Sequence, residues 1–238
     1  MSRCRTTPAL LLAVLAGALY AVMWVGHTRH WGWLHDFDLP LLAPAHDLGI
    51  NSPAWVRFWH GVSFVLGPVP LRLLGLLAAL VALARRTVRL ALLLLFCAPL
   101  DGLVTAAAEG LAGRPRPMTA LVAESSTSFP SGHAREATAS LLALLAFLLP
   151  MIRSRWMRVA AIAVSALSVL MVGVARVALN VHHPSDVIAG WSLGYLYFLV
   201  CLFLFRPQIP CFAAIFGLSR RSNSTESKAL LDLESGQR

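Results

Sequence analysis

The sequence predicts an all-α fold, a polytopic membrane helical bundle of about six transmembrane helices. Hydrophobic residues make up 58% of the 238 residues and charged residues only 13%, a balance that a water-soluble domain could not hide from solvent. Six apolar runs approach or exceed the roughly 20 residues that a helix needs to cross a bilayer. The four cysteines are widely spaced and two lie inside apolar runs, which indicates neither a disulfide framework nor a thiolate metal site.

The first predicted span runs from about Pro8 to Gly26. No small-residue cleavage site follows it, so we expect it to be retained in the protein. The stretch from His27 to Pro53 mixes histidines, prolines and tryptophans, and we expect a loop there with a short helix at the membrane interface. The second span, from about Trp55 to Ala84, contains two prolines, Pro68 and Pro70, which predict a kink.

Four further spans complete a membrane domain over residues 1–206. The remaining residues, 207–238, are polar and poor in aromatic side chains, and we expect a disordered cytoplasmic tail. The four predicted spans run from about Val88 to Ala112, His133 to Met151, Val159 to Ala178 and Pro184 to Phe205.

Arginines collect on one side of this layout. If the N-terminus is inside, every inner loop carries arginine, as the positive-inside rule requires, and both termini are cytoplasmic. The formal net charge of +9 is therefore interpreted as a topology signal and not as a nucleic-acid site. The bias toward alanine, leucine and arginine is typical of a bacterial inner-membrane protein. The inner arginines are Arg3, Arg5, Arg85, Arg86, Arg89, Arg153, Arg155, Arg158, Arg206, Arg220 and Arg221.

Three polar blocks fall on the opposite, outer side. Charge placed at or near membrane depth costs several kcal/mol and by default marks function. Two further acids lie inside spans: Asp101 is expected to face the bundle, and Glu136 either tunes His133 or pairs with an arginine. The three blocks are Gly113-Arg114-Pro115-Arg116-Pro117, then Phe129-Pro130-Ser131-Gly132-His133, and then Arg176, His182 and Asp186.

The side chains of these blocks suit phosphoryl transfer. A phosphoryl group in transfer spreads negative charge over its equatorial oxygens, which the planar guanidinium groups of Arg116 and Arg176 match. The N–H groups of Ser131 and Gly132, at a helix start, would add uncharged donors.

Two histidines divide the remaining chemistry. One must attack phosphorus unprotonated, with its other ring nitrogen hydrogen-bonded, and Asp186 lies four residues after His182 on the same helical face. His133 is left to protonate the departing oxygen and later to take a proton from water. The scheme needs no metal and no cofactor.

The three blocks in this order resemble the signature of the type 2 phosphatidic acid phosphatase family. These are integral membrane lipid phosphatases related to bacterial acid phosphatases and vanadium haloperoxidases. The resemblance covers Glu109 to Asp186 in motif and nearly the whole chain in its six-span layout. It implies that His182 is the nucleophile that forms a phosphohistidine, that His133 is the acid, and that Asp186 orients His182. The implied phosphate ligands are Arg116, Arg176, Ser131 and Gly132.

The sequence departs from that signature at two positions. The family usually has a lysine seven positions before the last arginine of the first block, and here that position is Glu109, which cannot bind a phosphate dianion. Either Arg114 replaces the lysine as a phosphate ligand, or Glu109 modulates the site by meeting a cationic group. The third block opens with Ala175 where the family usually has serine.

The sequence therefore predicts a metal-independent lipid phosphatase whose partners are the bilayer and a lipid phosphate in its outer leaflet. An isoprenyl pyrophosphate, a phosphatidylglycerol phosphate and a phosphatidate are the substrates that the resemblance implies. Two alternatives stay open: a lipid phosphotransferase that uses the same intermediate, and a non-catalytic phospholipid-binding membrane protein, which Glu109 makes conceivable. The sequence does not fix the oligomeric state.

Overall fold

The computed structural model describes residues 7–124 and 126–207, which form nine α-helices and no strand. The all-α prediction is confirmed, whereas all but the first residue of the predicted tail lies outside the described residues. The helices are α1 (Thr7–Thr28), α2 (Gly32–Asn51), α3 (Pro53–Val65), α4 (Pro68–Ala84), α5 (Val88–Cys97), α6 (Asp101–Ala112), α7 (Gly132–Leu148), α8 (Arg155–Ala178) and α9 (Pro184–Phe205).

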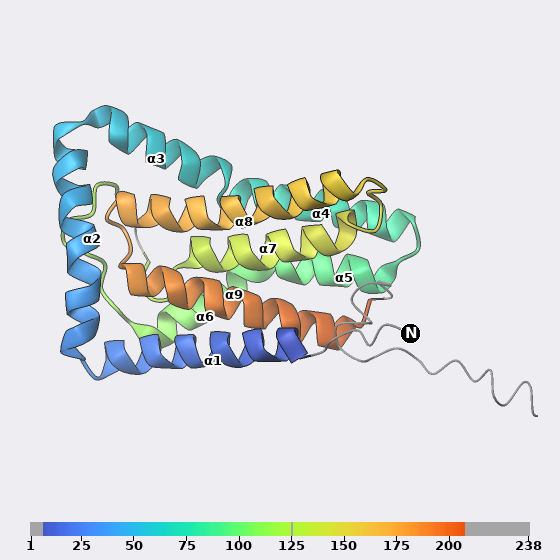
Figure 1. The fold of residues 1–238 in the computed structure, drawn as a ribbon, viewed down its shortest axis with the longest axis horizontal. Helices are drawn as coiled ribbons and strands as arrows, with labels where there is room; N and C mark the ends of the chain where they lie inside the picture. Colours follow the sequence, from blue (N-terminus) through green and yellow to red (C-terminus); the bar gives the residue numbers. More distant parts are fainter. Residues whose placement is uncertain (1–6, 125, 208–238) are drawn as a thin grey trace, which may run out of the picture.

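Five segments of the described chain are long and apolar enough to cross a membrane: Ala9–Thr28, Pro53–Ala84, Val88–Ala112, Arg155–Ala178 and Pro184–Phe205. The sixth predicted span is α7, which has 17 residues and packs against α4, α5, α6, α8 and α9 in the middle of the bundle (Figure 1). Residues 134–140 of this helix are all buried. The neighbouring helices therefore shield its charged side chains from lipid.

Two predicted spans are each divided into two helices. The kink expected near Pro68 is a complete break, because α3 ends at Val65 and α4 begins with Pro68 in its first turn, where no N–H is needed. The third predicted span, from Val88 to Ala112, is confirmed as a segment of membrane-crossing length, but it consists of two helices, α5 and α6. It breaks after Cys97, because the residue before Pro99 is sterically pushed out of the helical region.

The segment predicted as a loop with a short helix is instead the 20-residue helix α2. It runs across the end of the bundle, between the end of α1 and the start of α3 (Figure 1). The buried residues Leu34, Asp38 and Leu42 are spaced by four and form one face against the bundle. These contacts stabilise a helix that contains two prolines, so tertiary packing outweighs local propensity here.

Helices α7 and α9 approach each other closely through glycine. A Cβ at Gly190 would lie 2.6 Å from the carbonyl oxygen of Ser131, and one at Gly194 would lie 2.4 Å from that of Arg135. Any larger residue would push the two helices apart. The two glycines therefore fix the start of α7 against the first half of α9, where the second and third sequence blocks meet.

Candidate active site

The three polar blocks converge at the end of the bundle that α2 crosses (Figure 1). Arg114 and Arg116 follow the end of α6, Ser131 is the N-cap of α7, and Arg176 lies in the last turn of α8. His182 lies in the short turn between α8 and α9. Four helix ends thus bring together residues that are up to 72 positions apart in the chain.

His182 is buried and has a defined tautomer. Its Nδ1 lies 2.7 Å from the carbonyl oxygen of Ser128, and its Nε2 lies 3.0 Å from Nη1 of Arg116. Because a guanidinium can only donate, Nε2 accepts and Nδ1 carries the proton. Burial holds the pKa of His182 well below its usual 6.5, and the charge of Arg176 lowers it further. The imidazole is therefore neutral, with the Nε2 lone pair facing an arginine.

Asp186 does not make the predicted hydrogen bond to His182. Its Oδ2 lies 3.9 Å from Nδ1 of His182, too far for a hydrogen bond, and Nδ1 donates to Ser128 instead. The Asp186 carboxylate accepts from the Ser128 hydroxyl and, at 2.8 Å, from the backbone N–H of His183. It therefore holds the turn that carries His182, and Ser128 is the intermediary that the sequence interpretation missed.

Arg114 is held by the protein's own carboxylates. Its Nη1 donates to the Ser185 hydroxyl at 2.8 Å and to Asp186 at 2.5 Å, and its Nη2 donates to Asp38 at 2.9 Å. Asp38 also accepts from the backbone N–H and hydroxyl of Ser185, which fastens α2 to the start of α9. These two carboxylates neutralise the charge of Arg114, which does not favour the hypothesis that it replaces the family lysine as a phosphate ligand.

Arg116 and Arg176 have a different environment. Arg116 donates to neutral acceptors: the carbonyl oxygens of Ser126 and Val181, the Ser126 hydroxyl, and Nε2 of His182. Arg176 donates to the Ser63 hydroxyl at 3.1 Å and to Glu124 at 2.5 Å, but its buried Nε has no partner among the residues that the structure describes. A buried donor without a partner is costly, and such atoms indicate a place for a ligand.

Ser131 and Gly132 form the start of α7. The N–H of Ser131, predicted to bind phosphate, donates to the carbonyl oxygen of Asp186 at 3.0 Å, whereas its buried hydroxyl has no partner. A Cβ at Gly132 would lie 2.6 Å from Thr105 and 3.3 Å from the Glu109 carboxylate. Glycine thus allows α6 to approach this helix start and places Glu109 on the wall of the site.

His133 and His182 share their charged neighbours. Arg116 and Arg176 act electrostatically on both imidazoles, and Arg72 also acts on His133. Within residues 7–124 and 126–207, no three His, Cys, Asp or Glu side chains are grouped to bind a metal ion. The positive charge facing both histidines is therefore supplied by guanidinium groups.

A second polar cluster lies on the next turn of α7. Arg135 pairs with Asp101 at 2.7 Å, and both side chains are fully buried. Glu136 forms a bidentate pair with Arg72, at 2.9 and 3.0 Å, and the Thr105 hydroxyl joins the two pairs. Asp101 does face the bundle as predicted, and Glu136 pairs with an arginine of α4.

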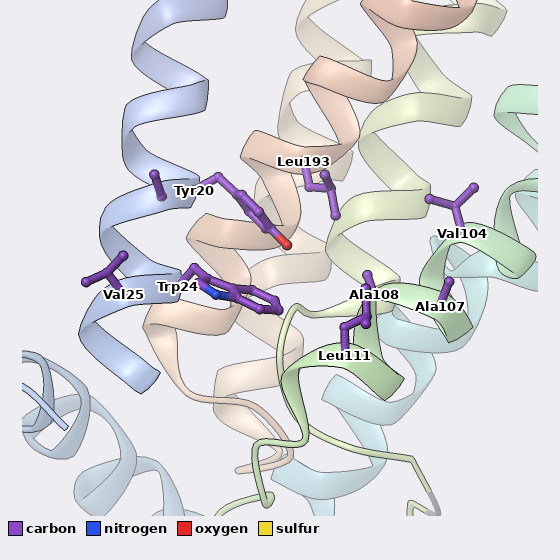
Figure 2. A pocket seen from close by; sticks show the side chains of 9 residues that line it. Tyr20, Trp24, Val25, Val104, Ala107, Ala108, Leu111 and Leu193 are labelled. Carbon is purple, nitrogen blue, oxygen red and sulfur yellow. The ribbon is translucent and has the colours of Figure 1, made fainter. Parts of the chain in front are cut away.

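An apolar pocket of about 500 Å³ lies between α1, α6 and α9 (Figure 2). The side chain of Trp24 lines it and packs edge-on against Phe129, with ring centroids 5.7 Å apart. Phe129 comes two residues before Ser131, so this ring contact links the pocket lining to the segment that leads into α7. The lining residues come from α1, α6 and α9: Tyr20, Ala21, Trp24, Val25, Val104, Ala107, Ala108, Leu111 and Leu193.

Comparisons with known proteins agree with this architecture. The family model described as the PAP2 superfamily matches residues 90–210. Phosphatidylglycerophosphatase B of Bacillus subtilis (strain 168) is 42% identical over 83 residues, which are 34% of this chain and 40% of that relative. The crystal structure of a transmembrane PAP2-type phosphatidylglycerolphosphate phosphatase from Bacillus subtilis gives a TM-score of 0.66 at 26% identity, covering 83% of this chain and 96% of the other.

Proposed function

Since this chain belongs to the PAP2 superfamily, we propose that it removes a terminal phosphate from a membrane lipid phosphate or pyrophosphate through a phosphohistidine at His182. The observation that carries the proposal is the neutral His182, whose Nε2 lone pair lies 3.0 Å from Arg116. Unpartnered donors on Arg176 and Ser131 complete an anion site around it. The two guanidinium groups supply the positive charge for which other phosphatases use metal ions.

Each residue has one task in the reaction. Arg116, Arg176 and the hydroxyl of Ser131 bind the phosphate oxygens. The Nε2 lone pair then forms a bond to phosphorus while the bond from phosphorus to the lipid oxygen breaks, and His133 gives that oxygen a proton. In the second step His133 takes a proton from water, the water oxygen binds phosphorus, and the phosphorus–nitrogen bond breaks to release inorganic phosphate.

The apolar pocket supports a lipid as the substrate. Leu193 in the pocket lies seven residues after Asp186, which is about 10 Å along α9. A hydrocarbon chain held in this pocket would lie between α1, α6 and α9, farther along α9 than Asp186. The names of both relatives make phosphatidylglycerol phosphate the first lipid to test, with phosphatidate and an isoprenyl pyrophosphate as the others.

The distribution of arginine supports a location of the site on the outer face of a bacterial inner membrane. The basic turn after α4 and the turn after α7 lie at the end of the bundle away from the site (Figure 1), where Arg85 donates to the sulfur of Met151 at 3.6 Å. Arg206 ends α9 at the same end of the bundle. The positive-inside rule places this end in the cytoplasm, together with both termini.

Phosphate release by purified protein in detergent tests the proposal. We expect release from at least one of the three lipids in the presence of EDTA, and loss of release in His182→Ala but not in a His60→Ala control, whose histidine is exposed on α3. An alkaline quench of the reaction should leave labelled phosphate on the wild-type chain. Release that EDTA stops, or that survives His182→Ala, would contradict the mechanism.

Two further measurements separate the alternatives. A phosphotransferase would pass the label from the intermediate to an added lipid hydroxyl instead of to water. A non-catalytic binding protein would retain lipid phosphate without releasing inorganic phosphate from any of the three lipids.

A further inference from the structure

Glu124 forms an ion pair with Arg176, one of the two arginines of the anion site. This residue lies in the loop between α6 and α7, and its Oε1 is 2.5 Å from Nη2 of Arg176. The Arg176 side chain is 3% exposed, whereas that of Glu124 is 28% exposed, so the carboxylate enters the site from its open side. A carboxylate oxygen and a phosphate oxygen present the same kind of acceptor to a guanidinium.

The same loop also holds the second arginine. The carbonyl oxygen and the hydroxyl of Ser126 each accept from Arg116 at 2.8 Å. Deeper in the site, Nε of Arg176 and the hydroxyl of Ser131 have no partner. Within residues 7–124 and 126–207, the loop therefore bonds the outer donors of the site, whereas the inner donors have no protein partner.

The pair of Glu124 and Arg176 differs from the other carboxylate–arginine pairs around the site. Asp101 and Asp186 are fully buried beside their arginines, so separating either pair would leave a charge without water. Glu124 is partly exposed, and an ion pair that water can reach is weak. Its carboxylate can leave Arg176 for solvent, which the buried acids cannot do.

We propose that Glu124 is an internal competitor for Arg176 that weakens the binding of every anion alike, so that a dianionic terminal phosphate still binds whereas the monoanionic phosphodiesters of the surrounding bilayer do not. When a phosphodiester displaces the Glu124 carboxylate from Arg176, one single negative charge replaces another. The net gain in binding free energy is therefore small. A terminal phosphate brings a second charge, which the two arginines can bind together with the vacant inner donors. This inference rests on the proposed function, because it takes Arg176 as a phosphate ligand.

Two measurements on the full chain in detergent micelles test Glu124→Gln. The first is equilibrium binding of inorganic phosphate at about pH 8, where phosphate is mainly dianionic. The second is inhibition of lipid phosphate hydrolysis by phosphatidylglycerol, a phosphodiester. Asp47→Asn is the matched control, because it removes one acidic charge from an exposed position on α2 at the same end of the bundle.

We expect Glu124→Gln to bind phosphate about tenfold more tightly, equivalent to about 1.4 kcal/mol. Its hydrolysis of lipid phosphate should be half-inhibited at an about tenfold lower concentration of phosphatidylglycerol than that of the wild type. Glu124→Ala, which also removes the acceptor, should shift both values in the same direction, and Asp47→Asn should shift neither. Unchanged or weaker phosphate binding in both Glu124 variants would overturn the proposal. Phosphate binding needs no turnover, so it decides the role of Glu124 even if the wild-type chain hydrolyses none of the three lipids.

Discussion

Two polar clusters share helix α7, and they differ in how their arginines are neutralised. In the inner cluster, Arg135 and Arg72 each meet a carboxylate of the chain, at 2.7 and 2.8 Å. In the outer cluster, Arg116 meets neutral acceptors. Arg176 pairs with Glu124, which is partly exposed, and its buried Nε has no partner among the described residues. His133 belongs to the outer cluster and Arg135 to the inner one, although they are two residues apart.

The two clusters therefore contain two kinds of arginine. In one kind the protein's own carboxylates neutralise the charge, and in the other the charge and N–H donors are available to a ligand. A buried arginine paired with a buried carboxylate of the chain has no charge left for an anion, and breaking the pair leaves an uncompensated charge. An arginine with neutral acceptors or a vacant N–H has both charge and donors available. By this criterion Arg114, paired with Asp38 and Asp186, holds the structure, while the environment of Arg116 fits its proposed role as a phosphate ligand.

The largest expected effect separates His133 from Arg135. Replacing His133 by alanine removes the proton donor, and a lipid alkoxide is a poor leaving group. We expect kcat to fall about 10⁴-fold, at the upper end for general acid catalysis, while the unfolding midpoint in detergent stays unchanged. On a substrate with a much better leaving group, His133→Ala should lose far less kcat relative to the wild type. A loss below tenfold on the natural type of lipid would contradict the assignment of His133 as the acid.

The reverse pattern is expected at Arg135. Replacing it by methionine leaves Asp101 charged and fully buried, which should reduce the free energy of unfolding by about 4 kcal/mol. The folded fraction should keep a kcat near that of the wild type. Unfolding in detergent micelles measures the change. The double variant Arg135→Met with Asp101→Leu should recover most of the lost stability, and equal values for the single and double variants would show that the ion pair is not the cause.

Arg114 and Arg116 provide the same contrast within one sequence block. Arg114→Met should lower the free energy of unfolding by about 3 kcal/mol, because Asp38 and Asp186 lose their shared cation. Arg116→Met should instead lower kcat/KM about 100-fold, the cost of one lost donor to the transition state, with little change in stability. Parallel unfolding and steady-state measurements test both. If Arg114→Met were stable but inactive, Arg114 would be a phosphate ligand after all.

The sequence predicted the outer cluster better than the inner one. Apolar length located the helices, and the order of the three blocks predicted which helix ends carry chemistry. The role of Arg114 could not be predicted, because Asp38 reaches it only after α2 folds across the bundle end, and that packing is tertiary. The partner of Asp101 was equally hidden, since a span's sequence does not say which neighbouring helix its acid faces. Ser128 bonds His182 through its backbone carbonyl, which no side-chain pattern reveals.

The smallest expected effect is on the free energy of unfolding at acidic pH. It tests whether His182 is neutral in the folded protein. Burial lowers the pKa of His182 in the folded protein below the value of about 6.5 in the unfolded chain, so the unfolded chain binds the extra proton first. The stability that His182 contributes is therefore complete above about pH 6.5 and is lost as the pH falls below it, by at most about 1.4 kcal/mol per pH unit. His182→Gln cannot bind that proton, so its free energy of unfolding should fall less steeply than that of the wild type between about pH 6.5 and 5. Equal slopes would show that His182 binds its proton equally well in the folded and unfolded chains, which would contradict a neutral imidazole held by burial.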